Sequence, residues 1–135
     1  MPDFVVSRIT LALNDRGKSV RGAKVLVLGL AYKPDVDDVR ESPSFELIEK
    51  LEHLGAAVDY NDPLVPKTHR MRHHDLDMSS VDITPAAISK YDCVVISTNH
   101  SAYDWQMIAD HAKLLIDTRG VTRAIKGRRE NIVMA

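Results

Sequence analysis

The feature that most constrains the fold is a compact apolar run at residues 24–29, Lys-Val-Leu-Val-Leu-Gly, which ends in glycine. A strand that is apolar on both faces is typical of the buried interior of a parallel sheet. Similar short runs follow at 57–61, 93–97, 114–116 and 132–134. Because segments with helical periodicity separate most of these runs, the sequence predicts βαβ units with right-handed crossovers. The expected fold is α/β, a doubly wound and mostly parallel sheet with helices on both faces.

Helix boundaries follow from capping signals and apolar periodicity. Ser42 and Pro43 suit an N-cap and a first helical position, and Gly55 suits the left-handed residue after a helix end. The predicted helices are residues 2–16, 43–54, 85–90 and 103–111, with a helical turn at 122–126. Between them, residues 63–80 are predicted to be irregular, and residues 81–83 to form a short strand.

Composition excludes several classes of protein. The chain has 135 residues, which suits a single domain, and its 18 Lys and Arg residues nearly balance 19 Asp and Glu residues. A nucleic-acid binder would normally carry a large excess of positive charge, so no nucleic-acid partner is expected. No apolar run is long enough for a membrane span, and the N-terminus does not resemble a signal peptide. We therefore expect a cytoplasmic protein with no membrane partner.

Polar residues gather after the predicted strands, where ligands bind in doubly wound sheets. The segment after the first strand, residues 30–41, lacks the second and third glycines of a G-x-G-x-x-G dinucleotide fingerprint. A whole NAD is therefore not expected there. Lys33 and Arg40 are candidate phosphate ligands, and Tyr32 offers a ring face to a base or a sugar. The alternative is a surface ion network among the charges of this segment.

Arg119 is a further candidate, because it follows the apolar run 114–116 at the carboxyl end of a predicted strand. Such a position faces the ligand crevice of a doubly wound sheet. The alternatives are a surface arginine or an ion-pair partner for Asp117.

Two other features have structural interpretations. One group of side chains has metal-ligand chemistry, namely His69, His73, His74, Asp75 and Asp77. Adjacent histidines tend to point apart, so no metal site is expected. Cys93, the only cysteine, cannot form an internal disulfide. It opens a buried strand, where it is expected to behave as a small hydrophobe.

Four segments carry a family resemblance. Residues 29–44 read Gly-Leu-Ala-Tyr-Lys-Pro-Asp-Val-Asp-Asp-Val-Arg-Glu-Ser-Pro-Ser. Shorter segments follow at 60–63, 94–100 and 116–119. In this order they resemble the signatures of the C-terminal domain of the UDP-glucose/GDP-mannose dehydrogenase family, and the likeness covers nearly the whole chain.

The resemblance implies the UDP-sugar-binding domain of an NAD-dependent nucleotide-sugar 6-dehydrogenase, which oxidises the sugar C6 alcohol to a uronic acid. Family members place a Rossmann NAD-binding domain and a central dimerisation region before a Rossmann-like domain that binds UDP. Residues 1–21 would then be the end of the central region, and residues 22–135 the UDP-binding domain. NAD would be held mainly by the missing N-terminal domain, and the catalytic cysteine would lie upstream of this chain. The expected partners are the UDP-sugar substrate and the enzyme's own N-terminal and central domains, within a homo-oligomer.

The resemblance also assigns residues by motif position. Tyr32 and Lys33 would line the sugar-nucleotide pocket, Arg119 would bind the UDP portion, and Arg40 would reach toward NAD in the missing domain. Cys93 does not match the family's catalytic cysteine. No catalytic residue is therefore expected in this chain, and the chain alone should be inactive.

The substrate and two other classes of protein stay open. The forms at 98–100 and 117–119, Thr-Asn-His and Asp-Thr-Arg, are similar to those of members that act on UDP-N-acetylhexosamines. UDP-N-acetylglucosamine is expected first, before UDP-N-acetylmannosamine and UDP-glucose. The alternatives are a stand-alone nucleotide-binding regulatory module without catalysis and, last, a receiver-like signalling domain.

Overall fold

The structure is a computed structural model that describes residues 2–40, 42–68, 77–127 and 129–135. Its centre is a five-stranded sheet in which every strand pair is parallel, in the order β2-β1-β3-β4-β5. The strands are β1 (Lys24–Leu28), β2 (Ala57–Asn61), β3 (Cys93–Ile96), β4 (Leu115–Asp117) and β5 (Ile132–Met134). The predicted doubly wound sheet is confirmed.

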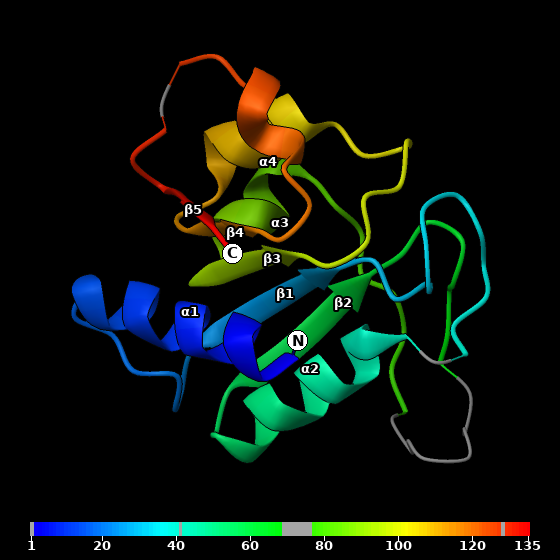
Figure 1. Ribbon diagram of the computed structural model, residues 1–135, viewed down its shortest axis with the longest axis horizontal. Helices are drawn as coiled ribbons and strands as arrows, with labels where there is room; N and C mark the ends of the chain where they lie inside the picture. The colour runs from blue at the N-terminus through cyan, green and yellow to red at the C-terminus, as the bar shows by residue number, and fades with distance from the viewer. Residues whose placement is uncertain (1, 41, 69–76, 128) are drawn as a thin grey trace.

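Helices cover both faces of this sheet (Figure 1). The helices are α1 (Pro2–Asp15), α2 (Pro43–His53), α3 (Pro85–Ser89) and α4 (Trp105–His111), with a short 3-10 helix, η1 (Val121–Ala124), after β4. Neighbouring residues of β1 point to opposite faces, so Val27 joins the core under α1 and α2, and Leu28 joins the core under α4. Within the described ranges, no helix is long and apolar enough to cross a membrane.

Side-chain caps fix where two of the helices begin. The Ser42 hydroxyl accepts a hydrogen bond from the Ser44 amide (3.2 Å), and Pro43 occupies the first position of α2. In the same way, the Thr84 hydroxyl accepts a hydrogen bond from the Ala87 amide (3.1 Å) at the start of α3. Both starts are those that the sequence predicts.

The strand predicted at residues 81–83 is wrong. The Val81 amide donates to the Tyr60 carbonyl (2.9 Å), as in a sheet. The Val81 carbonyl, however, accepts a hydrogen bond from the side-chain amide of Asn61 (2.6 Å) instead of from a strand. Thr84 then caps α3, so no ladder continues. The other predicted helices and strands differ from the observed ones by two residues or fewer at each end.

α1 packs into the core. Ile9 and Leu13 are fully buried and belong to the same cluster as Phe45 of α2. On the other side of α1, Phe4 and Leu11 are 52% and 58% exposed. The helix therefore contributes to the core and also leaves apolar surface open. The domain boundary expected ahead of β1 stays a prediction.

Cys93 begins β3 and lies in the core. It is fully buried, and burial raises the pKa of its thiol to about 12. A thiol that stays protonated at neutral pH is a poor nucleophile. The predicted burial of Cys93 is confirmed.

We predict that Cys93→Ala lowers the free energy of unfolding by about 1 kcal/mol, because a small buried group is removed from a close-packed strand. Urea denaturation followed by circular dichroism measures this loss. The native thiol should resist a soluble disulfide reagent at neutral pH, whereas the urea-unfolded chain should react quickly. Rapid labelling of the native chain would contradict the assignment.

Candidate functional site

The strand order reverses between β1 and β3, and doubly wound sheets bind ligands outside the carboxyl ends of the strands at such a point. Here the loop after β1 (residues 29–40, the first loop) passes close to the segment after β3. A Cβ atom on Gly29 would lie 2.7 Å from the Thr98 backbone nitrogen, and Gly29 has a φ of +94°. Glycine is therefore needed for the loop to leave the sheet along this path.

The buried carboxylate of Asp62 holds the start of the first loop. Asp62 follows β2 and is 2% exposed. Its Oδ2 accepts hydrogen bonds from the amides of Leu30 (2.8 Å) and Ala31 (3.1 Å), and Oδ1 accepts one from the Leu64 amide (2.8 Å). A dinucleotide-binding loop would direct such amides at a pyrophosphate. Because Asp62 engages them, this loop does not fit the pyrophosphate of NAD.

His100 links the same carboxylate to the middle of the first loop. Its Nδ1 accepts a hydrogen bond from the Asp35 amide (2.9 Å), so the neutral ring carries its proton on Nε2 and donates it to Asp62 (2.8 Å). The Asp35 carboxylate accepts hydrogen bonds from the Ser101 hydroxyl (2.6 Å) and amide (2.8 Å), and these lower the pKa of that carboxyl. The first loop is thus fixed at both its start and its middle.

The first loop exposes the three candidates that the sequence places in it. Tyr32 is 51% exposed, and Lys33 is exposed and forms no salt bridge with a described residue. Arg40 forms a bidentate ion pair with Asp38 (3.0 and 2.9 Å), and this contact lowers the pKa of the Asp38 carboxyl to about 2. The ion pair that was the alternative for Arg40 is present, although its side chain remains 84% exposed.

A second buried carboxylate shapes the turn after β4. Asp117 is fully buried, and its Oδ1 accepts hydrogen bonds from the amides of Arg119 (2.9 Å) and Gly120 (2.8 Å). Its Oδ2 accepts them from the amide (2.9 Å) and hydroxyl (2.6 Å) of Thr122. Burial opposes ionisation of this carboxyl, but the four hydrogen bonds outweigh it and the pKa is lowered. Asp117 therefore binds the backbone of Arg119 and not its guanidinium.

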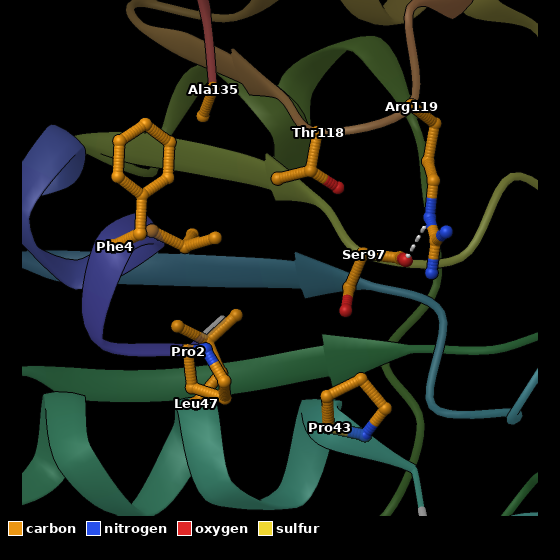
Figure 2. A pocket seen from close by; sticks show the side chains of 9 residues that line it. Pro2, Phe4, Pro43, Leu47, Ser97, Thr118, Arg119 and Ala135 are labelled. Atoms are coloured by element: carbon orange, nitrogen blue, oxygen red, sulfur yellow. Dashed lines mark hydrogen bonds between the residues drawn. The ribbon is translucent and has the colours of Figure 1, made fainter.

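The Arg119 side chain extends along the end of β3, where its Nε donates to the Ser97 carbonyl (2.9 Å; Figure 2). Nη1 and Nη2 have no hydrogen-bond partner in the part of the chain that the structure describes. With Ser97 and Thr118, Arg119 lines the polar side of a cavity of about 320 Å³. The rest of this apolar cavity is lined by Pro2, Phe4, Val5, Pro43, Leu47 and Ala135.

A second cavity, of about 440 Å³, adjoins the first, because Phe4 and Arg119 belong to the lining of both. Its charged lining residues are Arg8, Arg119, Arg123 and Asp117. We call it the basic cavity, since three guanidinium groups surround it and its one side-chain carboxylate is buried. Both cavities lie within the range of roughly 300–1,000 Å³ that small-molecule sites occupy.

The structure divides the predicted residues into two groups. Arg119 lines both cavities, whereas Tyr32, Lys33 and Arg40 line neither of them. The three first-loop residues therefore lie on the same edge of the sheet as Arg119 but outside its cavities.

Sequence reasoning missed three residues of this edge. His100 gave a signal, since it closely follows a buried strand at the end where Asp62 follows another. Arg123 gave a weaker one, because it lies in the helical turn predicted shortly after Arg119. Arg8 gave none, because its contact with the Met134 carbonyl (2.8 Å) joins the two ends of the chain.

The residues with metal-ligand chemistry in the sequence lie outside the described part of the chain, apart from Asp77. They are His69, His73, His74 and Asp75. Within the ranges that the structure describes, no group of three or more His, Cys, Asp or Glu side chains is arranged to hold a metal ion.

We predict that Asp117→Asn lowers the free energy of unfolding by about 1–3 kcal/mol at neutral pH, because the amide group replaces one acceptor oxygen with a donor. A carboxyl whose pKa is lowered by folding stabilises the protein above its unfolded-state pKa, near 4, and that contribution is lost as the pH falls through the folded-state pKa. The difference between wild type and variant, measured by urea denaturation, should shrink below about pH 4. Asp82→Asn, at an exposed carboxylate, is the control; equal losses would contradict this role.

This chain is similar to known UDP-sugar dehydrogenases. Residues 26–124 match the sequence profile of the UDP-glucose/GDP-mannose dehydrogenase family, UDP binding domain. The UDP-glucose 6-dehydrogenase of Rickettsia bellii is 30% identical over an alignment of 128 residues, which covers 91% of this chain and 29% of that protein. The UDP-N-acetyl-D-mannosamine dehydrogenase of Methanococcus maripaludis is 33% identical over 103 residues, 76% of this chain and 22% of that protein.

A solved structure of another UDP-sugar dehydrogenase also resembles this chain. The UDP-D-ManNAc dehydrogenase of Pyrococcus horikoshii has a TM-score of 0.73 at 26% identity, over 98% of this chain and 29% of the other. The chain therefore spans less than a third of the length of the relatives described here. Since the profile match extends from β1 to η1 and includes both the first loop and Arg119, the chain belongs to the UDP-glucose/GDP-mannose dehydrogenase family and carries its UDP binding domain.

Proposed function

We propose that this chain binds the UDP portion of a UDP-N-acetylhexosamine for an NAD-dependent 6-dehydrogenase, which oxidises the sugar C6 alcohol to a uronic acid. One observation carries the proposal: the Arg119 guanidinium is held by Ser97 at the carboxyl edge of the sheet, and Nη1 and Nη2 remain available beside two cavities. A guanidinium fixed in this way is pre-organised to donate hydrogen bonds to phosphate or ribose oxygens.

The first loop has a separate role in the proposal. Tyr32 and Lys33 are exposed on a loop whose backbone Asp62 and His100 fix, so they can meet a ligand with little further ordering. We assign these two residues to the sugar side of the substrate. Arg40, exposed farther along the same loop, is assigned to the NAD held by the domain upstream.

The identity of the sugar in the substrate rests on the names of the relatives and on one sequence motif. Two of the relatives described above are named as dehydrogenases of UDP-N-acetylmannosamine, and another as a UDP-glucose 6-dehydrogenase. Together with the Thr-Asn-His form at 98–100, these names support an N-acetylhexosamine, with UDP-N-acetylglucosamine as the first substrate to test.

The oxidation itself is assigned to other domains of a longer, cytoplasmic and homo-oligomeric enzyme. Cys93 is the only cysteine and is fully buried, so this chain offers no accessible thiol as a nucleophile. Neither does the first loop fit the pyrophosphate of NAD, since Asp62 engages its amides. Residues 1–21 are assigned to the end of the central region, and residues 22–135 to the UDP-binding domain.

We predict that the 135-residue chain binds UDP and that Arg119→Ala weakens this binding tenfold to about a hundredfold. Loss of a charged hydrogen-bond partner costs about 1.5–3 kcal/mol, which corresponds to that range. Isothermal titration calorimetry with UDP measures the affinity. Arg40→Ala removes the same charge from the first loop and should leave UDP binding unchanged.

Two results would contradict this proposal. Failure of the folded wild-type chain to bind UDP would refute UDP binding, and equal losses in both variants would refute the separate roles of the arginines. An NADH absorbance assay with UDP-N-acetylglucosamine should detect no turnover. Clear reduction of NAD by the chain would show that the oxidation does not need other domains.

A further inference from the structure

The basic cavity carries more positive charge than the binding of UDP through Arg119 alone requires. Arg8, Arg119 and Arg123 reach it from α1, from the turn after β4 and from η1. Its one side-chain carboxylate, Asp117, is fully buried, and among the described residues it accepts hydrogen bonds from Arg119, Gly120 and Thr122. The charged side chains that remain accessible in the cavity are therefore all cationic, which favours an anionic ligand.

The guanidinium groups differ in how far the protein engages them. Arg8 donates through Nε (3.3 Å) and Nη2 (2.8 Å) to the Met134 carbonyl, which holds it at the end of β5. Arg123 forms no hydrogen bond or salt bridge with a described residue. Its guanidinium lies over Gly120, where a Cβ atom would be 3.4 Å from Arg123 Nε. Two anchored arginines and one unengaged arginine thus border the same space.

The neighbouring apolar cavity identifies the kind of anion. Phe4 and Arg119 line both cavities, so a ligand that occupies them together must join a flat apolar part to an anionic part. A nucleoside diphosphate has this construction. Phe4 is 52% exposed and offers a ring face on which a base can stack.

Resting on the proposed function, we propose that Arg123 and Arg8 bind the diphosphate of the nucleotide in the basic cavity. The base occupies the apolar cavity against Phe4, and Arg119 lies at the junction of the two. Lys33, which lines neither cavity, is left to the sugar end of the substrate. Arg123 and Arg8 are thereby further determinants of affinity, beyond the residues that the sequence predicts.

The test compares Arg123→Gln with Lys126→Gln, which removes one positive charge from an exposed residue outside the basic cavity. Calorimetry is run with UDP, with uridine and with inorganic pyrophosphate. We expect Arg123→Gln to weaken binding of UDP and pyrophosphate tenfold to about a hundredfold and to leave uridine unchanged. Arg123→Lys, which keeps the charge but loses the planar fork, should give an intermediate loss.

The outcomes separate this inference from the proposed function. If the wild-type chain binds UDP and Arg123→Gln binds it as well as Lys126→Gln does, the assignment of the basic cavity is overturned. If the folded wild-type chain binds pyrophosphate but not uridine or UDP, the cavity holds anions and the proposed function fails. Binding of none of the three ligands overturns both. Because Arg123 is exposed and unengaged, circular dichroism should find the variants folded.

Discussion

The carboxyl edge of the sheet depends on the burial of the Asp62 carboxylate among hydrogen-bond donors. A buried charge is costly unless its oxygens are satisfied, and here the backbone of Leu30, Ala31 and Leu64 and the ring of His100 satisfy them. The same bonds tie the end of β2 to the first loop and to the segment after β3. Three segments far apart in the sequence thus acquire one arrangement from one side chain.

Asp117 is likewise a buried carboxylate whose oxygens are satisfied by hydrogen bonds, here at the end of β4. Its oxygens accept hydrogen bonds from the backbone and hydroxyl of the turn that follows, so its charge stabilises the turn without pairing with an arginine. The consequence is electrostatic. The carboxylates of Asp62 and Asp117 are buried, whereas Arg119 and Arg123 are exposed beside the cavities. The charged side chains that remain accessible around the basic cavity are therefore cationic.

The fold could be predicted from the sequence because buried parallel strands and capped helices leave local patterns, as in 24–29 and at Ser42-Pro43. The strand predicted at 81–83 was wrong because its apolar pattern did not reveal that the Asn61 side-chain amide donates a hydrogen bond to the Val81 carbonyl. Arg119 could be placed at the ligand edge, since that edge follows from strand direction alone. The contacts of His100 and Arg8 could not be predicted from the sequence, because they depend on how distant segments pack.

The proposed function requires UDP to bind at the carboxyl edge of the sheet around Arg119. An NMR titration of the ¹⁵N-labelled chain with UDP tests it most directly. Binding at this edge should concentrate the amide shifts after β3 and β4, at Ser97 and at 118–123. It is contradicted if UDP causes no shifts, or if the shifts concentrate at the amino edge of the sheet around Lys24 and Ala57, where another cavity lies.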